Sequence, residues 1–250
     1  MITSRLNLFK TFILLCSLNF QCALAKEVLK FNSFEIPKFI LSKGTGTFVD
    51  YLHLIFKDSP WDVEVDVLPP RRSYKLFLDG KADGFIPTNK ARVKEGFYNS
   101  DIYFYKDEYL FALNEIKEVP TKGRICITDG YLYDTSAFSK DIQIVKTSSD
   151  NSCLKMLLKG RVDYFLGEIL SCTRKARDMG LKNIKAYPQA ISTTEVTIGI
   201  RKGKGMEKVL KFVNKRIREL NRSGEAKNIF KKDIDLVKNI LGLSIDPTSP

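Results

Sequence analysis

The sequence predicts an α/β protein built as two lobes, and three observations support this fold class. From residue 26 onward, segments typical of strands alternate with segments of helical periodicity, and the alternation starts again near residue 124. The segments 76–85 (LFLDGKADGF) and 156–165 (MLLKGRVDYF) resemble each other. The composition, 44% hydrophobic and 28% charged, is that of a folded globular protein. Two such runs fit two lobes better than one large sheet.

Residues 1–25 are expected to be a cleaved signal peptide. They contain Arg5 and Lys10 but no acid, continue with an apolar run over 11–20 that is too short to span a bilayer, and end in Ala23-Leu24-Ala25. Two alternatives stay open: an N-terminal membrane anchor, and a lipoprotein, although neither cysteine in this region follows a small residue. We therefore expect a periplasmic mature chain of 225 residues.

Strand and helix signals follow one another through the first run. Residues 62–68 (DVEVDVL) alternate strictly between polar and apolar, which predicts a strand, and Pro69-Pro70 ends it. Apolar residues recur at helical spacing between Phe48 and Lys57. The expected elements are, in order, strand 28–33, helix 48–57, strand 62–68, helix 71–78 ending before Gly80, strand 84–87 and strand 109–113.

The second run repeats this alternation and closes with a long helix. Its expected elements are strands 124–128 and 142–146, helix 152–159, strand 162–166, strand 196–201, and a helix that Gly224 ends. That last helix has one apolar face, from Met206 to Leu220, and one basic face. We expect the basic face to be solvated.

Charge and motif content exclude several function classes. The net charge is +12, and +10 once Arg5 and Lys10 leave with the signal peptide, but the cations are spread along the chain. We therefore expect a charged surface and no nucleic-acid partner. The chain has no glycine-rich nucleotide fingerprint, no Cys-x-x-Cys spacing, and a single histidine, His53, on which a Ser/His/Asp mechanism would depend entirely. No cofactor and no metal site are expected.

Several motifs together resemble one known family. They are the signal peptide, the two Gly-[Lys/Arg]-x-Asp units at Gly80 and Gly160, and Ala91-Arg92 followed by 97–103 (FYNSDIY). In this order they are similar to bacterial extracellular solute-binding proteins of family 3, periplasmic receptors typified by polar amino-acid uptake. The resemblance covers residues 26 to 235.

The resemblance implies two Rossmann-like α/β lobes joined by two hinge strands, with the ligand trapped between the lobes. The implied boundaries are lobe 1 at 26–110 plus 197–250, lobe 2 at 114–192, and hinges at 111–113 and 193–196.

The resemblance also implies two charged ligand contacts. Arg92 stands where the family binds a ligand carboxylate, and Thr88 would add a hydroxyl contact. Glu168 stands five residues after Asp163, where the family places an acid for the ligand ammonium. From the residues alone, Arg92 could equally be a surface arginine that caps a helix, and Glu168 a charge at a helix N-terminus.

Other positions depart from the amino-acid receptors. Pro87 replaces part of a Ser/Thr-rich stretch, and Gly130-Tyr131-Leu132 stands where those receptors have a Ser-Thr pair. The segment Leu68 to Arg72 resembles a Pro-x-x-Arg feature of divergent members, so Arg72 is a candidate cation. The aromatic candidates for enclosing a ligand are Phe34, Phe39 and Tyr131, and for each of them a place in the core is the alternative.

Three cysteines remain after signal removal, and an exported protein can oxidise them. A C-x-x-x-G-[YW] context like that of divergent family members implies a disulfide between Cys126 and Cys153. A Cys153–Cys172 bond and three free thiols are the alternatives. A closed loop of this length stabilises by about 3 to 4 kcal/mol in the chain-entropy description.

The expected function is a monomeric periplasmic receptor that delivers a small, polar, carboxylate-bearing solute to an ABC permease or to a membrane sensor. Two alternatives belong to other classes. One is an enzyme on the same fold, similar to cyclohexadienyl dehydratases, for which Glu168 is the visible acid–base candidate. The other is a structural protein with a vestigial cleft.

Overall fold

The computed structural model describes residues 26–36, 38–89, 96–129 and 133–249. The strands form one mixed sheet with the order β2-β1-β3-β10-β5-β8-β6-β7, while β4 pairs with β10 and β9 pairs with β5. Its helices and strands, in chain order, are β1 (Glu27–Ser33), α2 (Thr47–Phe56), β2 (Trp61–Val67), α3 (Pro70–Leu78), β3 (Gly84–Asn89), β4 (Phe97–Asn99), β5 (Phe104–Ala112), β6 (Gly123–Thr128), β7 (Ile142–Thr147), α4 (Asp150–Leu158), β8 (Tyr164–Glu168), α5 (Ile169–Asp178), β9 (Lys185–Ala186), β10 (Ser192–Arg201), α6 (Met206–Ser223) and α7 (Glu225–Leu241).

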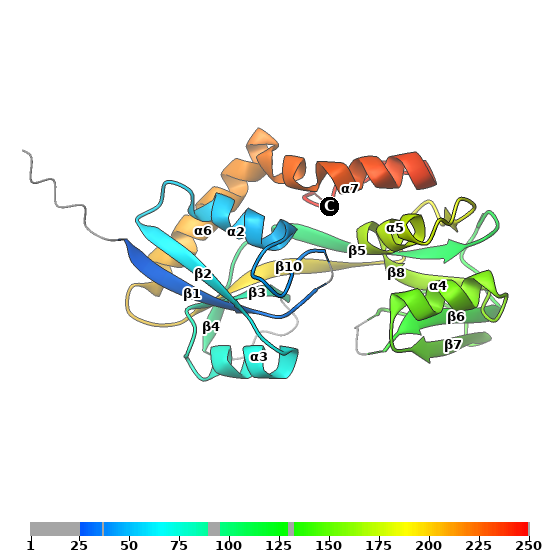
Figure 1. Cartoon of the computed structure of the whole chain (residues 1–250), viewed down its shortest axis with the longest axis horizontal. Helices are drawn as coiled ribbons and strands as arrows, with labels where there is room; N and C mark the ends of the chain where they lie inside the picture. The colour runs from blue at the N-terminus through cyan, green and yellow to red at the C-terminus, as the bar shows by residue number, and fades with distance from the viewer. Residues whose placement is uncertain (1–25, 37, 90–95, 130–132, 250) are drawn as a thin grey trace, which may run out of the picture.

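The sheet has two halves that two long strands connect (Figure 1). In the first half β1, β2 and β3 are parallel, and in the second half β6, β7 and β8 are parallel. β5 runs from the first half into the second, antiparallel to β8, and β10 returns, antiparallel to β3. The parallel strands of each half therefore run toward the other half, and the two sets of carboxyl ends face each other.

Helices cover both faces of the first half at its central strand β3, which is buried on both sides, whereas the edge strand β2 exposes its polar face. On β3, Phe85 packs with Phe77 of α3 and Phe97, while its neighbour Ile86 points into the main core with α2 and α6. Gly84 is required here, because a β-carbon at this position would lie 2.1 Å from the ring of Phe31. The helices and strand expected at 48–57, 71–78 and 62–68 are confirmed to within one residue.

A disulfide fastens helix α4 to strand β6 in the second half. Cys126 and Cys153 are bonded, with their α-carbons 5.5 Å apart, so the pairing that the resemblance implied is confirmed. Cys172 of α5 is a buried free thiol. The opposite face of this half has its own apolar cluster, which includes Leu110, Ile125 and Leu166.

The internal repeat has a structural role in both halves. The amide of Lys30 in β1 donates to Asp83, and the amide of Arg124 in β6 donates to Asp163, at 3.0 and 2.8 Å. In return, the amides of the two aspartates donate to the carbonyls of the same two residues. The repeated Asp thus ties each helix-to-strand loop to the first strand of its half.

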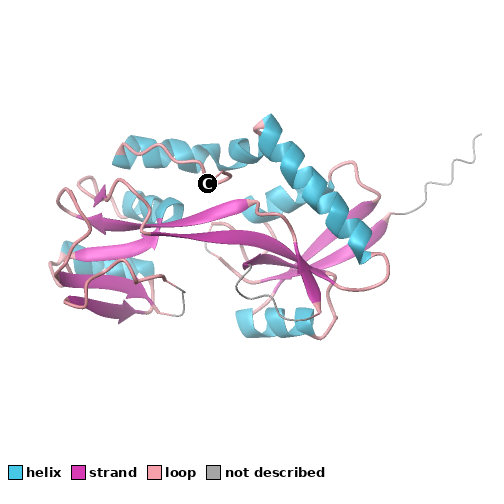
Figure 2. Cartoon of the chain, turned by 180° about the vertical axis from the view of Figure 1, so that it is seen from behind, coloured by secondary structure: helices cyan, strands magenta, loops and turns pink. Residues whose placement is uncertain are grey.

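Helices α5 and α7 were not among the expected elements, and they connect the two halves on one side (Figures 1 and 2). Arg174 of α5 forms an ion pair with Asp233 of α7, and both side chains are about nine-tenths buried. Lys38, in the loop after β1, pairs with Asp178 of α5 at 2.6 Å. Past α7, the carbonyl of Pro247 accepts a 2.7 Å hydrogen bond from the amide of Tyr105 in β5.

The crossing between the halves is shifted relative to the implied hinge at 111–113. Phe111 already pairs with Phe165 of β8 and with Ala186 of β9, so it lies inside the second half. The stretch of β5 that pairs with β10 alone is Phe104–Asp107, opposite 193–196. The apolar run 109–113 corresponds to the buried end of a longer strand, β5. The implied hinge at 111–113 was therefore placed at the end of this strand and not at the crossing. The lobe boundaries otherwise stay a prediction.

Candidate functional site

The facing carboxyl ends of the strands bring together most of the candidate residues. We define the first-lobe edge as residues 34–36, 68–72 and 88–89, which follow or end β1, β2 and β3. The second-lobe edge comprises residues 128–129, 147–150 and 168–171, at the ends of β6, β7 and β8. Ligands of open parallel sheets bind outside such carboxyl ends, so these two edges form the candidate site.

Aromatic side chains form a surface at the first-lobe edge. The ring of Phe34 lies 6.1 Å from that of Phe85, which lies 5.3 Å from that of Tyr74. Phe34 and Tyr74 keep part of their surface exposed, whereas Phe39 is buried and stacks on Phe48 with 4.7 Å between the ring centres. Phe34 therefore stays a candidate for ligand contact. Phe39 is a core residue, which was the alternative stated for it.

The other first-lobe candidates differ in exposure. Thr88 is 7% exposed and lies opposite Thr197 of β10 in the antiparallel ladder. Arg72 is exposed in the first turn of α3, directly after β2, and forms no ion pair with a described residue. Arg92 and Tyr131 lie outside the described residues.

Glu168 caps helix α5. Its two carboxylate oxygens accept hydrogen bonds from the amides of Leu170 and Ser171 at 2.8 and 2.7 Å, so the side chain satisfies two of the unpaired amides of the first turn. Burial raises the pKa of Glu168 to about 7, although the two amides and Lys106 lower it. The structure therefore shows the helix-terminus role that the residues left open.

A second glutamate lies directly opposite Glu168. Glu108 of β5 pairs with Glu168 across the antiparallel ladder and is 1% exposed. Its two oxygens accept from Lys106 Nζ and Ser192 Oγ, each at 2.6 Å. Like charges directly opposite each other in a sheet repel, and Lys106 offsets this repulsion.

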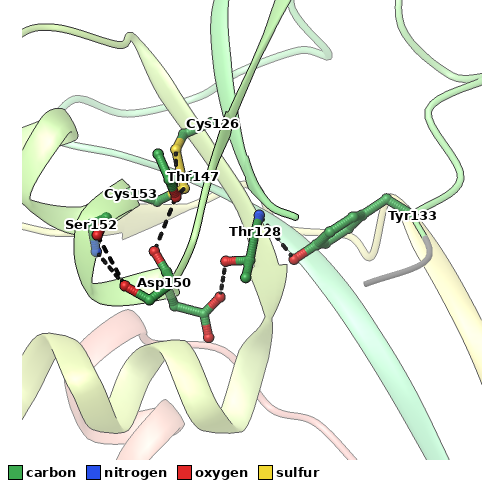
Figure 3. The surroundings of a disulfide bond; sticks show 8 residues. Cys126, Thr128, Tyr133, Thr147, Asp150, Ser152 and Cys153 are labelled. Atoms are coloured by element: carbon green, nitrogen blue, oxygen red, sulfur yellow. Dashed lines mark hydrogen bonds between the residues drawn. A yellow bond between two sulfur atoms is a disulfide. The ribbon is translucent and has the colours of Figure 1, made fainter. Parts of the chain in front are cut away.

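Asp150, another acid of the second-lobe edge, begins helix α4. One of its oxygens accepts from the hydroxyl of Thr128, and the other pairs with Lys175 of α5 (Figure 3 shows the first contact). Tyr133 Oη accepts from the amide of Thr128, and Lys106 Nζ lies 5.6 Å above the Tyr133 ring. These contacts link β5, β6, α4 and α5 in one polar cluster.

Sequence reasoning identified Glu168 but not Lys106, Glu108, Asp150 and Lys175. A visible signal was the charged segment 106–108 (KDE), which interrupts an otherwise apolar strand. No group of three or more His, Cys, Asp or Glu side chains with the proximity of a metal site occurs among the described residues, and His53 is exposed on α2.

Comparisons with known proteins identify the fold. No protein-family profile and no curated protein sequence matches the chain. Among solved structures, the periplasmic domain of Bordetella pertussis BvgS matches with a TM-score of 0.70 at 19% identity, covering 84% of this chain and 44% of that one, less than half its length.

Two further structures match over nearly their whole length. A substrate-binding domain of a putative amino-acid ABC transporter from Streptococcus pneumoniae has a TM-score of 0.64 at 17% identity, covering 83% of this chain and 99% of that one. The ancestral cationic amino-acid solute-binding protein AncCDT-1 is described as a precursor of cyclohexadienyl dehydratase. It matches with a TM-score of 0.66 at 16% identity, covering 82% of this chain and 94% of that one.

These likenesses confirm the fold that the resemblance implied. The chain has the two-lobed α/β fold of type II periplasmic binding proteins. Within the described part of the chain, none of the helices has the length and apolar content needed to cross a bilayer.

Proposed function

We propose that this protein is a periplasmic solute-binding receptor that encloses a small carboxylate-bearing solute between its two lobes. One observation carries the proposal: the carboxyl ends of both parallel strand sets face each other across β5 and β10. Structures of the same fold from amino-acid transport support this assignment.

The two edges supply the contacts in this proposal. Phe34, Arg72, Thr88 and Arg92 line the solute from the first lobe, and Tyr131 and Glu168 line it from the second. An arginine suits a carboxylate because its planar fork donates two parallel hydrogen bonds. The aromatic ring of Phe34 covers the apolar part of the solute.

Binding operates by closure in this proposal. The lobes are joined by the paired stretch of β5 and β10, Phe104–Asp107 with 193–196, and in this proposal the stretch is the hinge. A solute that contacts both edges binds the closed form more tightly than the open form, so it shifts the population toward closure. The shift signals occupancy to a membrane partner, an ABC permease or a sensor.

Export and oxidation are consistent with a periplasmic location. Residues 1–25 have the pattern of a signal peptide, and the bond between Cys126 and Cys153 belongs in an oxidising compartment. We propose cleavage after Ala25, which mass spectrometry of periplasmic extract tests by finding Lys26 at the mature N-terminus.

A screen for solutes tests the receptor function directly. The full mature chain is heated with single metabolites from a library that spans carboxylates, amino acids, amines and sugars. We expect a small set of carboxylates to raise the Tm in a concentration-dependent way, and small-angle scattering to show compaction with the same solutes. A library without any stabilising solute, or stabilisation without compaction, contradicts the receptor proposal.

Catalysis on the same fold is the second candidate function. It is favoured by the pKa of Glu168, which burial raises to about 7, a value suited to proton transfer near neutral pH. The likeness to a precursor of cyclohexadienyl dehydratase points to elimination from a cyclohexadienyl acid. Turnover of such an acid, lost in Glu168→Gln, would replace the receptor proposal by this one.

A further inference from the structure

Helix α6 has a row of cations on the side that faces away from the core. The row, which we call the α6 stripe, consists of five exposed side chains: Lys208, Lys211, Lys215, Arg218 and Arg222. They are spaced alternately three and four residues apart, so they lie on one face of the helix along about 21 Å. The opposite face is buried in the core and contains Met206, Val209, Val213, Ile217 and Leu220.

Much of the charge of the α6 stripe has no acidic partner. The helix has six cations and only two acids. Lys215 lies 3.7 Å from Glu219, and Arg218 pairs with Asp101. The other three members of the stripe form no ion pair with a described residue. A line of uncompensated cations attracts an extended surface of negative charge.

An aromatic side chain suited to a lipid interface lies beside the stripe. Trp61, at the start of β2, is partly exposed and packs against Phe212 of α6, with 5.5 Å between the ring centres. Tryptophan is favoured among lipid headgroups because its ring is apolar and its N–H is polar. The stripe and this ring therefore combine charge and interfacial affinity on neighbouring surfaces.

Residues 1–25 join the molecule next to this surface. They precede Lys26 and Glu27, and Glu27 accepts a 3.2 Å hydrogen bond from the indole N–H of Trp61. The apolar run over 11–20 enters the membrane during export if the segment is a signal peptide. Export therefore brings the α6 side of the protein close to the lipid headgroups.

The position of α6 leaves the candidate site accessible. Helix α6 lies on the opposite side of the first-half sheet from α3 (Figure 1). The start of α3 belongs to the first-lobe edge, so a surface that contacts α6 does not cover this edge.

We propose that the α6 stripe binds an anionic phospholipid surface and holds the protein at the membrane. The contact is peripheral and electrostatic, because the apolar face of α6 is buried in the core. The inference goes beyond the receptor function and does not depend on the identity of the solute.

Sedimentation with vesicles tests the inference on the full mature chain. We expect binding to vesicles of phosphatidylcholine mixed with phosphatidylglycerol and none to phosphatidylcholine alone. Binding should be lost when the ionic strength rises from about 0.1 M to about 1 M, because the Debye length falls from about 10 Å to about 3 Å. Trp61 is the single tryptophan of the chain, so spin-labelled headgroups in the vesicles should quench the tryptophan fluorescence.

Two variants with the same net charge separate the stripe from the overall charge of the protein. Each cation near an anionic surface contributes about fivefold to binding, so Lys208→Gln/Lys211→Gln/Arg222→Gln should bind about 100-fold more weakly. The three side chains are exposed, so the Tm should stay that of the wild type. The control Lys122→Gln/Lys140→Gln/Lys182→Gln removes three exposed cations from loops of the second half and should bind like the wild type.

Four outcomes would overturn the inference. Equal losses in the two variants would assign binding to net charge alone. Binding to phosphatidylcholine alone would exclude an electrostatic contact. Sedimentation without quenching of Trp61 would place the contact on another face. Binding to poly-L-glutamate but not to the anionic vesicles would assign the stripe to an acidic protein partner.

Discussion

At the end of β8, the side chain of Glu168 caps helix α5 by accepting hydrogen bonds from the amides of Leu170 and Ser171. The charged and titratable groups around it are Lys106 and Glu108 on β5, Asp150 on α4, and Cys172 and Lys175 on α5. Burial favours the protonated carboxyl, whereas the amides favour the carboxylate, and burial dominates.

This balance predicts a pH-dependent stability. The pKa of Glu168 is about 7 in the folded protein, above its usual 4.5, so the folded state binds the proton more tightly than the unfolded state. Its contribution is fully present below about pH 4.5 and is lost as the pH rises through 7. Relative to Glu168→Gln, the wild type should lose about 3 kcal/mol between pH 4.5 and pH 8. Denaturant unfolding of both proteins across this range measures it, and parallel curves would contradict the assignment.

Arg72 carries a prediction about binding rather than stability. Removal of an arginine that pairs with an enclosed carboxylate costs about 2 to 5 kcal/mol, so Arg72→Ala should weaken calorimetric binding of the screened solute by about 30-fold or more. Lys75→Ala is the matched control, because Lys75 pairs with Asp79 on the same helix α3 and is 73% exposed. Equal affinities for both variants would assign the carboxylate to Arg92 alone.

Single residues of the site were predictable only in part. The family resemblance, counted from the repeated Asp163, placed Glu168 at the end of β8, where the structure has it. Glu108 and Lys106 were not found, because their partners Glu168 and Ser192 are far away in sequence and only the strand register brings them together.

At the scale of elements, local sequence patterns predicted the helices α2 and α3 and the strand β2. In β2 the apolar and polar residues alternate. It did not predict α7, because the interior face of this helix contains Asp233 between Phe230 and Val237. That aspartate interrupts the apolar stripe and makes sense only beside Arg174. Helix α5 follows β8 without a break, so the strand signal masked its start.

The disulfide acts at the same scale, by fastening α4 to β6. The double variant Cys126→Ala/Cys153→Ala should lose about 3 to 4 kcal/mol of unfolding free energy. A reductant should destabilise the wild type by a similar amount and leave the double variant unchanged. Cys172 should react with alkylating agents only after unfolding, because it is fully buried. Peptide maps that link Cys153 to Cys172 would refute the pairing.

At the scale of the whole molecule, α7 and α5 hold the two halves together away from the facing edges. An ion pair this buried loses about 3 to 5 kcal/mol when one partner is removed, because the other charge remains without compensation. Asp233→Ala should therefore destabilise the protein by that amount in denaturant unfolding.

The same helix supplies the control. Asp235 forms an exposed i,i+4 pair with Lys231, so Asp235→Ala should cost about 0.5 kcal/mol or less. Similar losses for the two variants would mean that α7 contributes no specific link between the halves.

Strand order also determines when each half can assemble. β10 lies between β3 and β5, yet it is the last strand in the chain, so the first half stays one strand short until residue 201 has emerged. The second half has β5, β6, β7 and β8 in place once residue 168 is available. When the polypeptide emerges from its N-terminus, the first half is therefore the last to complete its part of the sheet, although most of its strands emerge first. Until then, it keeps an unpaired sheet edge. Chaperones that shield unpaired strands would act on the β3 edge during this interval.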